Sequence, residues 1–301
     1  MITARSAPNI ALIKYWGNRS NNLRLPAADS LSMQLDGPCV EVTVESHETF
    51  SVPRDLQRFT THFALVREYL RTLGIPNALP QAVRIGITSQ IPSGIGLASS
   101  AAVFSALAEA YAAIISKTRP LSRKEISVIA RLGSGSAARS VFGGFAALVA
   151  AGSGETIDSA YAILIAPKNH WLLYDVIIVP TQKEKSVGST EGHALAHTSQ
   201  LFTDRIANIP RRQQECIDAI MKRDFEKLQR VAEEDCANMH AVMQTSTPPL
   251  HYLSEETHRI IREIKELRTR EHLPVLYTMD AGPTVHLICP EEAILKVQAF
   301  A

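Results

Sequence analysis

Residues 91–102 read Ile-Pro-Ser-Gly-Ile-Gly-Leu-Ala-Ser-Ser-Ala-Ala, and this segment is the most informative about the architecture. The alternating run at residues 83–89 precedes it and predicts a strand. Residues 99–116 are rich in Ala with almost no charge, which favours a helix buried on most sides. Small residues between a strand and a helix let backbone N–H groups approach an anion at the helix N-terminus. The segment therefore predicts a phosphate-binding loop, although taken alone it is also compatible with an ordinary turn.

Short apolar or alternating runs predict further strands on both sides of this loop. They lie at residues 39–45, 143–150, 161–167 and 172–179. The S-x-x-E pattern of Ser122 and Glu125 predicts a capped helix that runs toward Leu132.

The pattern changes after about residue 182, where charged amphipathic helices are predicted. They lie near residues 211–222, 225–243 and 254–269. Two more predicted strands, VLYTM and TVHLIC, flank a turn at residues 280–283. The chain is therefore predicted to be α+β, with an N-terminal domain over residues 1–183 and a C-terminal domain over residues 184–301.

Composition excludes several classes of partner. The 301 residues include 31 basic and 30 acidic side chains without a long run of either sign, so nothing predicts nucleic-acid or membrane-surface binding. No signal-like segment opens the chain and no stretch reaches the length of a membrane span, so a cytoplasmic location is expected. The four cysteines have no metal-ligand spacing, so neither structural zinc nor a disulfide framework is predicted.

The loop lacks the Walker spacing with its lysine and also lacks the dinucleotide fingerprint. Its string P-S-G-I-G-L-A-S-S-A-A, at residues 92–102, instead resembles the triphosphate loop of the GHMP kinases. The resemblance implies the GHMP kinase fold, with two α/β domains and the active site in the cleft between them. It also implies ATP with Mg²⁺, for which no metal ligands are assigned. The implied ATP-binding residues are Pro92, Gly94, Gly96, Leu97, Ser99 and Ser100.

Three further segments resemble one branch of this superfamily, the mevalonate diphosphate decarboxylases. They are A-P-N-I-A-L-I-K-Y-W-G at residues 7–17, G-S-G-S-A-A-R-S at residues 133–140 and Y-T-M-D-A-G-P at residues 277–283. The resemblance makes Asp280 and Lys14 the catalytic residues. It makes the following residues substrate-binding: Tyr15, Asn18, Ser134, Ser136, Arg139 and Ser189. Weaker similarity at residues 186–190, at His240 and at residues 248–253 extends the match over nearly the whole chain.

The resemblance implies an ATP-dependent carboxy-lyase of the mevalonate pathway of isoprenoid biosynthesis. In that chemistry a transient 3-phosphate leaves as inorganic phosphate while the substrate carboxylate leaves as carbon dioxide. Asp280 orients or deprotonates the C3 hydroxyl, and Lys14 keeps Asp280 ionised and offsets phosphate charge. Positioning and electrostatics dominate phosphoryl transfer, so Asp280 need not be a strong base.

The chain departs from the family pattern where the substrate phosphates are expected. Asn18 occupies the position of a second lysine, and Ala28 and Thr284 stand where the family commonly has asparagine. A charged phosphate contact contributes roughly 1.5–3 kcal/mol, so its loss weakens a diphosphate more than a monophosphate. Mevalonate 5-phosphate, giving isopentenyl phosphate, is therefore the first predicted substrate.

Other functions stay open. Mevalonate 5-diphosphate, giving isopentenyl diphosphate, is the alternative substrate, and a small-molecule kinase that releases no carbon dioxide is the second alternative. A non-catalytic binding protein of the same fold is a third. The resemblance also suggests a homodimer.

Overall fold

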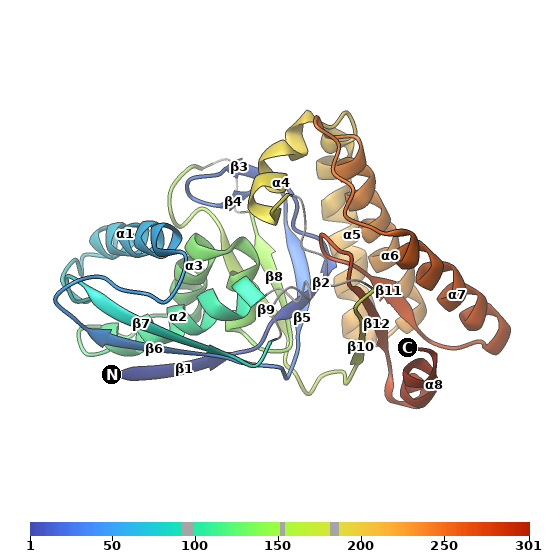
Figure 1. Cartoon of the computed structure of the whole chain (residues 1–301), viewed down its shortest axis with the longest axis horizontal. Coiled ribbons are helices and arrows are strands. Elements are labelled where there is room, and N and C mark those ends of the chain that lie inside the picture. Colours follow the sequence, from blue (N-terminus) through green and yellow to red (C-terminus); the bar gives the residue numbers. More distant parts are fainter. Residues whose placement is uncertain (92–98, 151–153, 181–186) are drawn as a thin grey trace.

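The computed structural model describes residues 1–91, 99–150, 154–180 and 187–301. The N-terminal half contains an antiparallel sheet in the order β1-β6-β7, formed by β1 (Ile2–Ser6), β6 (Val40–Ser46) and β7 (Val83–Ser89). Along β6 the residues Val40, Val42 and Val44 are buried and alternate with more exposed polar residues, as expected for a sheet with one covered face. Figure 1 shows this sheet beside a group of helices at one end of the molecule.

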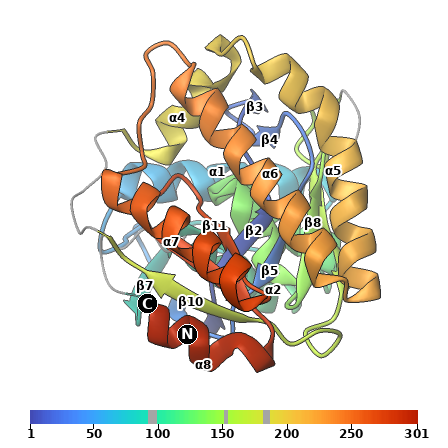
Figure 2. The ribbon, with the colours of Figure 1, turned by 90° about the vertical axis from the view of Figure 1, so that its right-hand side faces the viewer.

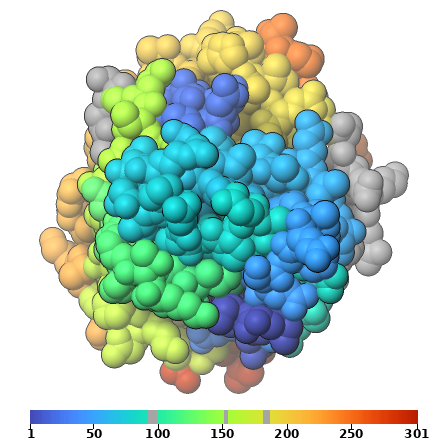
Figure 3. All heavy atoms as spheres, turned by 90° about the vertical axis from the view of Figure 1, so that its left-hand side faces the viewer, coloured from blue at the N-terminus to red at the C-terminus, as the bar shows by residue number. Residues whose placement is uncertain are grey.

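Three helices cover the buried face of that sheet. They are α1 (Leu56–Thr72), α2 (Ser99–Ile115) and α3 (Arg123–Gly133). Most residues of α2 are buried, which confirms the prediction of a helix enclosed on most sides, and the capping box of Ser122 and Glu125 opens α3 as predicted. The space-filling view in Figure 3 shows the residues of α1 and its neighbours spread over this end of the molecule.

A second antiparallel sheet lies at the centre of the molecule in the order β2-β5-β8-β9. Its strands are β2 (Asn9–Ile13), β5 (Ser30–Gln34), β8 (Phe145–Val149) and β9 (Tyr161–Ala166). The short pair β3 (Asn18–Ser20) and β4 (Leu25–Pro26) lies beyond β2, and a 3-10 segment, η1 (Gly135–Val141), connects α3 toward β8. Sequence reasoning did not identify β1, β5 or α1.

The C-terminal half contains the sheet β10-β12-β11, formed by β10 (Tyr174–Ile178), β12 (Val285–Cys289) and β11 (Leu276–Thr278). Figure 2 shows the long helices of this half side by side. The helical segments are α4 (Ser189–Leu195), η2 (Ala196–Thr198), α5 (Phe202–Lys222), α6 (Phe225–Gln244), α7 (Glu255–Glu271), η3 (Glu291–Ala293) and α8 (Ile294–Phe300).

The structure confirms every predicted strand and helix within a few residues, with one exception. Helix α5 begins at Phe202 and continues through Pro210, whereas the sequence pattern predicted its start near residue 211. Buried Arg205 and Ile209 anchor the first turns of α5, so tertiary contacts outweigh the helix-breaking tendency of the proline.

The two halves share a hydrophobic core. Ile10, Leu12 and Leu31 of the central sheet pack in one cluster with Ile220 and Val231 of α5 and α6. The predicted division between residues 183 and 184 stays a prediction, and β10, which precedes it, pairs with β12. Among the helices that the structure describes, none combines the length and the hydrophobicity that a membrane span requires.

Candidate active site

Two residues far apart in the sequence meet at the junction of the halves. Lys14 lies directly after β2 and Asp280 lies two residues after the end of β11. The Lys14 Nζ is 3.0 Å from the Asp280 Oδ1 across a separation of 266 residues. The Lys14 side chain is 1% exposed, whereas that of Asp280 is 33% exposed. A ligand can therefore reach the Asp280 carboxylate, whereas the Lys14 ammonium that pairs with it is buried.

The surroundings of Asp280 keep it ionised. Burial raises the pKa of this carboxyl, but electrostatic interactions with Lys14, His286 and Arg139 outweigh burial and hold the pKa below its usual range. A carboxylate in this state accepts a hydrogen bond from a hydroxyl group and can take its proton as that group reacts. The geometry is therefore suitable for binding and deprotonating a hydroxyl group of a substrate.

Arg139 lies on η1 beneath the central sheet and is 2% exposed. Its guanidinium donates to the Ser32 Oγ at 2.9 Å, the Asn9 Oδ1 at 3.2 Å and the Ser30 Oγ at 2.5 Å. Burial lowers the pKa of Arg139 to about 10, with Asp280 and Tyr15 opposing the change, so the group stays charged at neutral pH. Neutral side chains thus fix a cation near Asp280, which is suitable for binding an oxyanion.

Tyr15 contacts two groups of predicted substrate-binding residues, Asn18 and the segment around Gly135. Its hydroxyl donates to the Asn18 Oδ1, and its ring lies so close to Gly135 that an added Cβ there would come within 2.3 Å of a ring carbon. Gly135 separates Ser134 from Ser136, and the Ser134 Oγ lies 3.3 Å from the Ser136 Oγ. The absence of a side chain at Gly135 therefore lets Tyr15 close onto the serine segment.

The first turn of α2 reaches the same place. The Ser100 Oγ lies 3.3 Å from the Ser134 Oγ, and Ser99 is exposed at the start of the helix. The predicted residues Pro92, Gly94, Gly96 and Leu97 lie outside the described residues. Ser189 begins α4 and is exposed, one turn before His193, whose ring centroid is 4.3 Å from that of Tyr15.

Sequence reasoning missed two arginines beside this group. The Arg24 Nε donates to the Leu132 carbonyl at 3.2 Å, and the Arg58 Nη2 donates to the Gly133 carbonyl at 3.0 Å. Both guanidinium groups thus converge on the residues before Ser134, and both side chains are partly exposed. Burial and, to a smaller extent, the charge of Arg24 lower the pKa of Arg58 to about 10, with Asp55 opposing the change. Neither arginine stands in a recognisable motif, so the sequence offered no signal for them.

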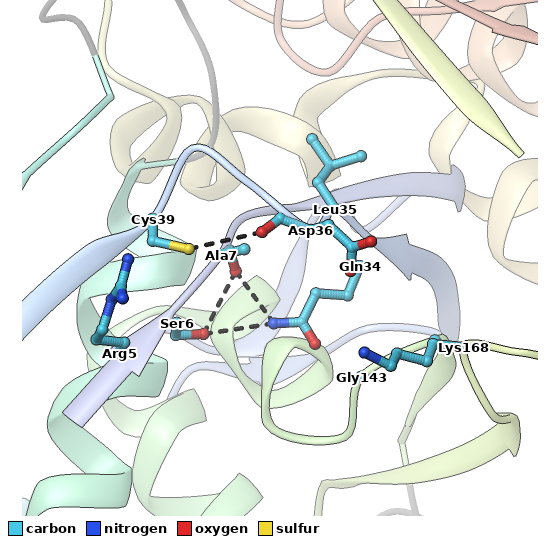
Figure 4. Close-up of a pocket in the computed structure, with 10 residues that line it drawn as sticks. Arg5, Ser6, Ala7, Gln34, Leu35, Asp36, Cys39, Gly143 and Lys168 are labelled. Carbon is cyan, nitrogen blue, oxygen red and sulfur yellow. Dashed lines mark hydrogen bonds between the residues drawn. The ribbon is translucent and has the colours of Figure 1, made fainter.

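A separate cavity of about 510 Å³ lies at the other end of β2. Figure 4 shows Ser6 at the end of β1, Ala7 directly after it, Gln34 at the end of β5, and Arg5 and Lys168 at opposite sides. None of the predicted site residues lines it. Within the described part of the chain, no group of three or more His, Cys, Asp or Glu residues is arranged to hold a metal ion.

Comparison with known proteins identifies the family of the chain. A family profile described as the diphosphomevalonate decarboxylase-like N-terminal domain matches residues 6–161, and one described as the mevalonate 5-diphosphate decarboxylase C-terminal domain matches residues 175–300. The chain belongs to the diphosphomevalonate decarboxylase family. It is accordingly an enzyme of a decarboxylase family, and the expected family resemblance is confirmed.

Individual members of the diphosphomevalonate decarboxylase family match over almost the full chain. The diphosphomevalonate decarboxylase of Ganoderma lucidum is 33% identical over 98% of this chain and 80% of its own. That of Rattus norvegicus is 32% identical over 99% of this chain and 79% of its own. These relatives carry the diphosphate name, so they do not support the first prediction of a phosphomevalonate decarboxylase and favour the alternative.

Solved structures confirm the fold. The crystal structure of mevalonate diphosphate decarboxylase from Staphylococcus aureus has a TM-score of 0.89 at 30% identity and covers 99% of this chain and 90% of its own. A structure described as MDDEF in complex with MVAPP, AMPPCP and magnesium has a TM-score of 0.87 at 29% identity and covers 99% of this chain and 91% of its own. The mixed α/β fold is therefore that of the GHMP kinase superfamily, as predicted.

The structure gives Arg139 a buried setting that allows a direct test. Arg139→Lys should raise KM for the mevalonate substrate about 10- to 100-fold, because a lysine keeps the charge but loses the planar fork of donors, at a cost of roughly 1.5–3 kcal/mol. Steady-state kinetics measure the change. Arg131→Lys is the matched control, since Arg131 is also buried but donates to backbone carbonyls such as Ala160 at 2.9 Å. An unchanged KM in Arg139→Lys, or an equal rise in both variants, would remove Arg139 from substrate binding.

Proposed function

We propose that this chain catalyses the ATP-dependent decarboxylation of mevalonate 5-diphosphate to isopentenyl diphosphate, with release of carbon dioxide, ADP and phosphate. The observation that carries the proposal is the Lys14–Asp280 pair, 3.0 Å apart, in a chain whose two halves match the two parts of the diphosphomevalonate decarboxylases. The small-molecule kinase and the non-catalytic binding protein are weaker candidates, because the relatives in both halves are named as decarboxylases.

The diphosphate is the better substrate for a second reason. The Asn18 Oδ1 accepts from Tyr15 and the Asn18 Nδ2 donates to the Asn21 Oδ1 at 3.0 Å, so this side chain is engaged within the protein. The Arg24 and Arg58 guanidinium groups lie beside Ser134, and they provide the positive charge that position 18 lacks. Two cations suit the larger charge of a diphosphate better than that of a monophosphate.

Each proposed role follows from a contact. Asp280 accepts the hydrogen bond of the substrate C3 hydroxyl and holds the proton that this group loses, while Lys14 offsets the charge that builds up on the transferred phosphoryl group. Arg139 binds an oxyanion of the substrate, and Ser134 and Ser136 with Tyr15 border the place of its phosphates. Loss of the C3 phosphate and cleavage of the C1–C2 bond then leave the C2=C3 double bond and carbon dioxide.

ATP supplies the phosphoryl group that makes the C3 oxygen a leaving group, and Mg²⁺ neutralises phosphate charge when bound. Exposed Ser99 and the Ser100 hydroxyl open α2 beside Ser134, and a helix N-terminus with hydroxyl groups fits a triphosphate. Mg²⁺ usually takes few protein ligands and many phosphate and water oxygens. The Ser100 hydroxyl, in the first turn of α2, would supply one such protein ligand. The homodimer and the cytoplasmic location remain predictions.

The substrate is tested by offering the purified protein ATP and magnesium with mevalonate, its 5-phosphate and its 5-diphosphate in parallel, with products identified by mass. We expect the highest kcat/KM for the 5-diphosphate and isopentenyl diphosphate as its product. A higher kcat/KM for the 5-phosphate would overturn the choice of substrate and restore the first prediction.

The two arginines provide a test of the phosphate count. Arg24→Gln and Arg58→Gln should each lower kcat/KM for the 5-diphosphate about tenfold and affect the 5-phosphate less, because a charged hydrogen bond contributes roughly 1.5 kcal/mol at the lower end of its range. Arg54→Gln is the matched control, since Arg54 is exposed and lies four residues before Arg58. Equal losses on both substrates would show that these arginines do not recognise the second phosphate.

A further inference from the structure

The backbone of Lys14 is held by side chains instead of by a neighbouring strand. Strand β2 ends at Ile13, so Lys14 lies just beyond the ladder that β2 forms with β5. Its N–H donates to the Asp235 Oδ2 at 2.7 Å, and its carbonyl accepts from the Arg205 Nη2 at 3.1 Å. The backbone N–H and the carbonyl of Lys14 are therefore bound by one pair of side chains, Asp235 and Arg205.

Arg205 and Asp235 form a deeply buried ion pair between α5 and α6. Their side chains are 1% and 0% exposed, and the two guanidinium nitrogens lie 3.0 and 3.1 Å from the two carboxylate oxygens. A bidentate pair of this kind fixes orientation as well as distance. A buried ion pair is weak evidence for stability, because desolvation opposes its attraction. Its contacts to the backbone of Lys14 indicate that it fixes the position of that residue.

Helix α6 also holds the chain next to Asp280. Cys236 follows Asp235, and its Sγ accepts from the Met279 N–H at 3.3 Å while its S–H donates to the Met279 carbonyl at 3.5 Å. Met279 directly precedes Asp280. Two consecutive residues of α6 thus hold the backbone on both sides of the Lys14–Asp280 contact. Asp235 binds the backbone of Lys14 in the N-terminal half, and Cys236 binds the backbone of Met279 in the C-terminal half.

We propose that Arg205 and Asp235 are positioning residues that set the place of the Lys14 ammonium relative to Asp280 for the decarboxylation reaction. The inference rests on the proposed function of the Lys14–Asp280 pair. A shift of about 1 Å in a reacting group can lower turnover about 10²-fold, so a residue that never touches the substrate can still control kcat. Neither Arg205 nor Asp235 lies in the segments that resemble the family motifs.

The test uses two changes that remove the contacts in different ways. Arg205→Lys keeps a buried positive charge, but a single ammonium cannot bind both Asp235 and the Lys14 carbonyl with the geometry of the guanidinium fork. The double variant Arg205→Met with Asp235→Leu removes both charges together, and such replacements are often neutral for stability. If Arg205→Lys fails to fold, the double variant, which is expected to fold, still tests the inference.

We expect both variants to lower kcat about 10- to 100-fold and to change KM less than about twofold, because neither residue touches the substrate. The acidic limb of the pH–rate profile should also move to higher pH. Lys14, His286 and Arg139 together hold the pKa of Asp280 down, and His240 lies against the backbone of Asp280. When Lys14 is displaced, the pKa of Asp280 rises, and its active anion is lost at a higher pH than in the wild type.

Arg212→Gln is the matched control. Arg212 lies in the same cluster, 3.5 Å from the Asp235 Oδ1, and its hydrogen bonds go to Glu234 and Asn238. It should leave kcat and the acidic limb unchanged even if Tm falls. Variants at Arg205 and Asp235 that lose only Tm, with kcat and the acidic limb as in the wild type, would overturn the inference. The absence of carbon dioxide release by the wild type would instead overturn the proposed function.

Discussion

Replacing Asp280 with asparagine should lower kcat about 10²- to 10⁴-fold while the fold and the affinity for ATP are retained. The substitution is nearly isosteric and removes the negative charge that handles the proton of the C3 hydroxyl, a contribution of that order for general acid–base catalysis. The Lys14 Nζ can still donate to the amide oxygen, so the buried lysine keeps a partner. Steady-state kinetics measure kcat, and calorimetric titration with ATP measures the nucleotide affinity.

Asp36→Asn is the matched control for Asp280→Asn, because Asp36 lines the separate cavity at the other end of β2. It should retain wild-type turnover. Near-normal kcat in Asp280→Asn would exclude Asp280 from the reaction, and a parallel loss of ATP affinity would indicate that the variant had changed the nucleotide site instead.

Replacing Lys14 with methionine should lower kcat about 10²- to 10³-fold, the range found when one electrostatic group that stabilises a transition state is removed. Methionine fits a site where the lysine side chain is only 1% exposed, and its stem keeps most of the packing. The pKa of Asp280 rises in this variant because the ammonium at 3.0 Å is lost. Turnover at low pH should therefore fall more than turnover at neutral pH.

The pH profile of Lys14→Met, compared with that of the wild type, measures this effect, since the phosphates of the substrates titrate equally in both. Lys168→Met is the control, because it removes the same charge from an exposed residue beside the separate cavity. A profile in Lys14→Met that follows the wild type at every pH would contradict the coupling of Lys14 to Asp280.

Much of the fold could be predicted from local pattern. The alternation of β6 and β7, the capping box of α3 and the apolar composition of α2 are local signals, and each element formed where the pattern indicated. The missed elements differ in their local signals. Helix α1 has buried Phe59, Phe63, Val66 and Leu70 at helical spacing and was overlooked. Strand β5 is short and includes two serines, which are buried because Arg139 donates to both.

The candidate site was predictable only through resemblance to a family. Nothing in the local sequence indicates that Lys14 and Asp280 meet, because 266 residues separate them and the contact depends on how the two halves pack. The same is true of Arg205 and Asp235, which are separated by 30 residues on different helices. The first predicted substrate rested on Asn18, Ala28 and Thr284, and it left out Arg24 and Arg58. These arginines come from other elements and are brought beside Ser134 only by folding.

The ratio of carbon dioxide to ADP tests the central claim most directly. Purified protein with ATP, magnesium and mevalonate 5-diphosphate labelled at the carboxyl carbon should release one labelled carbon dioxide for each ADP formed, because the C3 phosphate and the carboxylate leave together. Formation of ADP without labelled carbon dioxide would show a kinase and contradict the proposed decarboxylation.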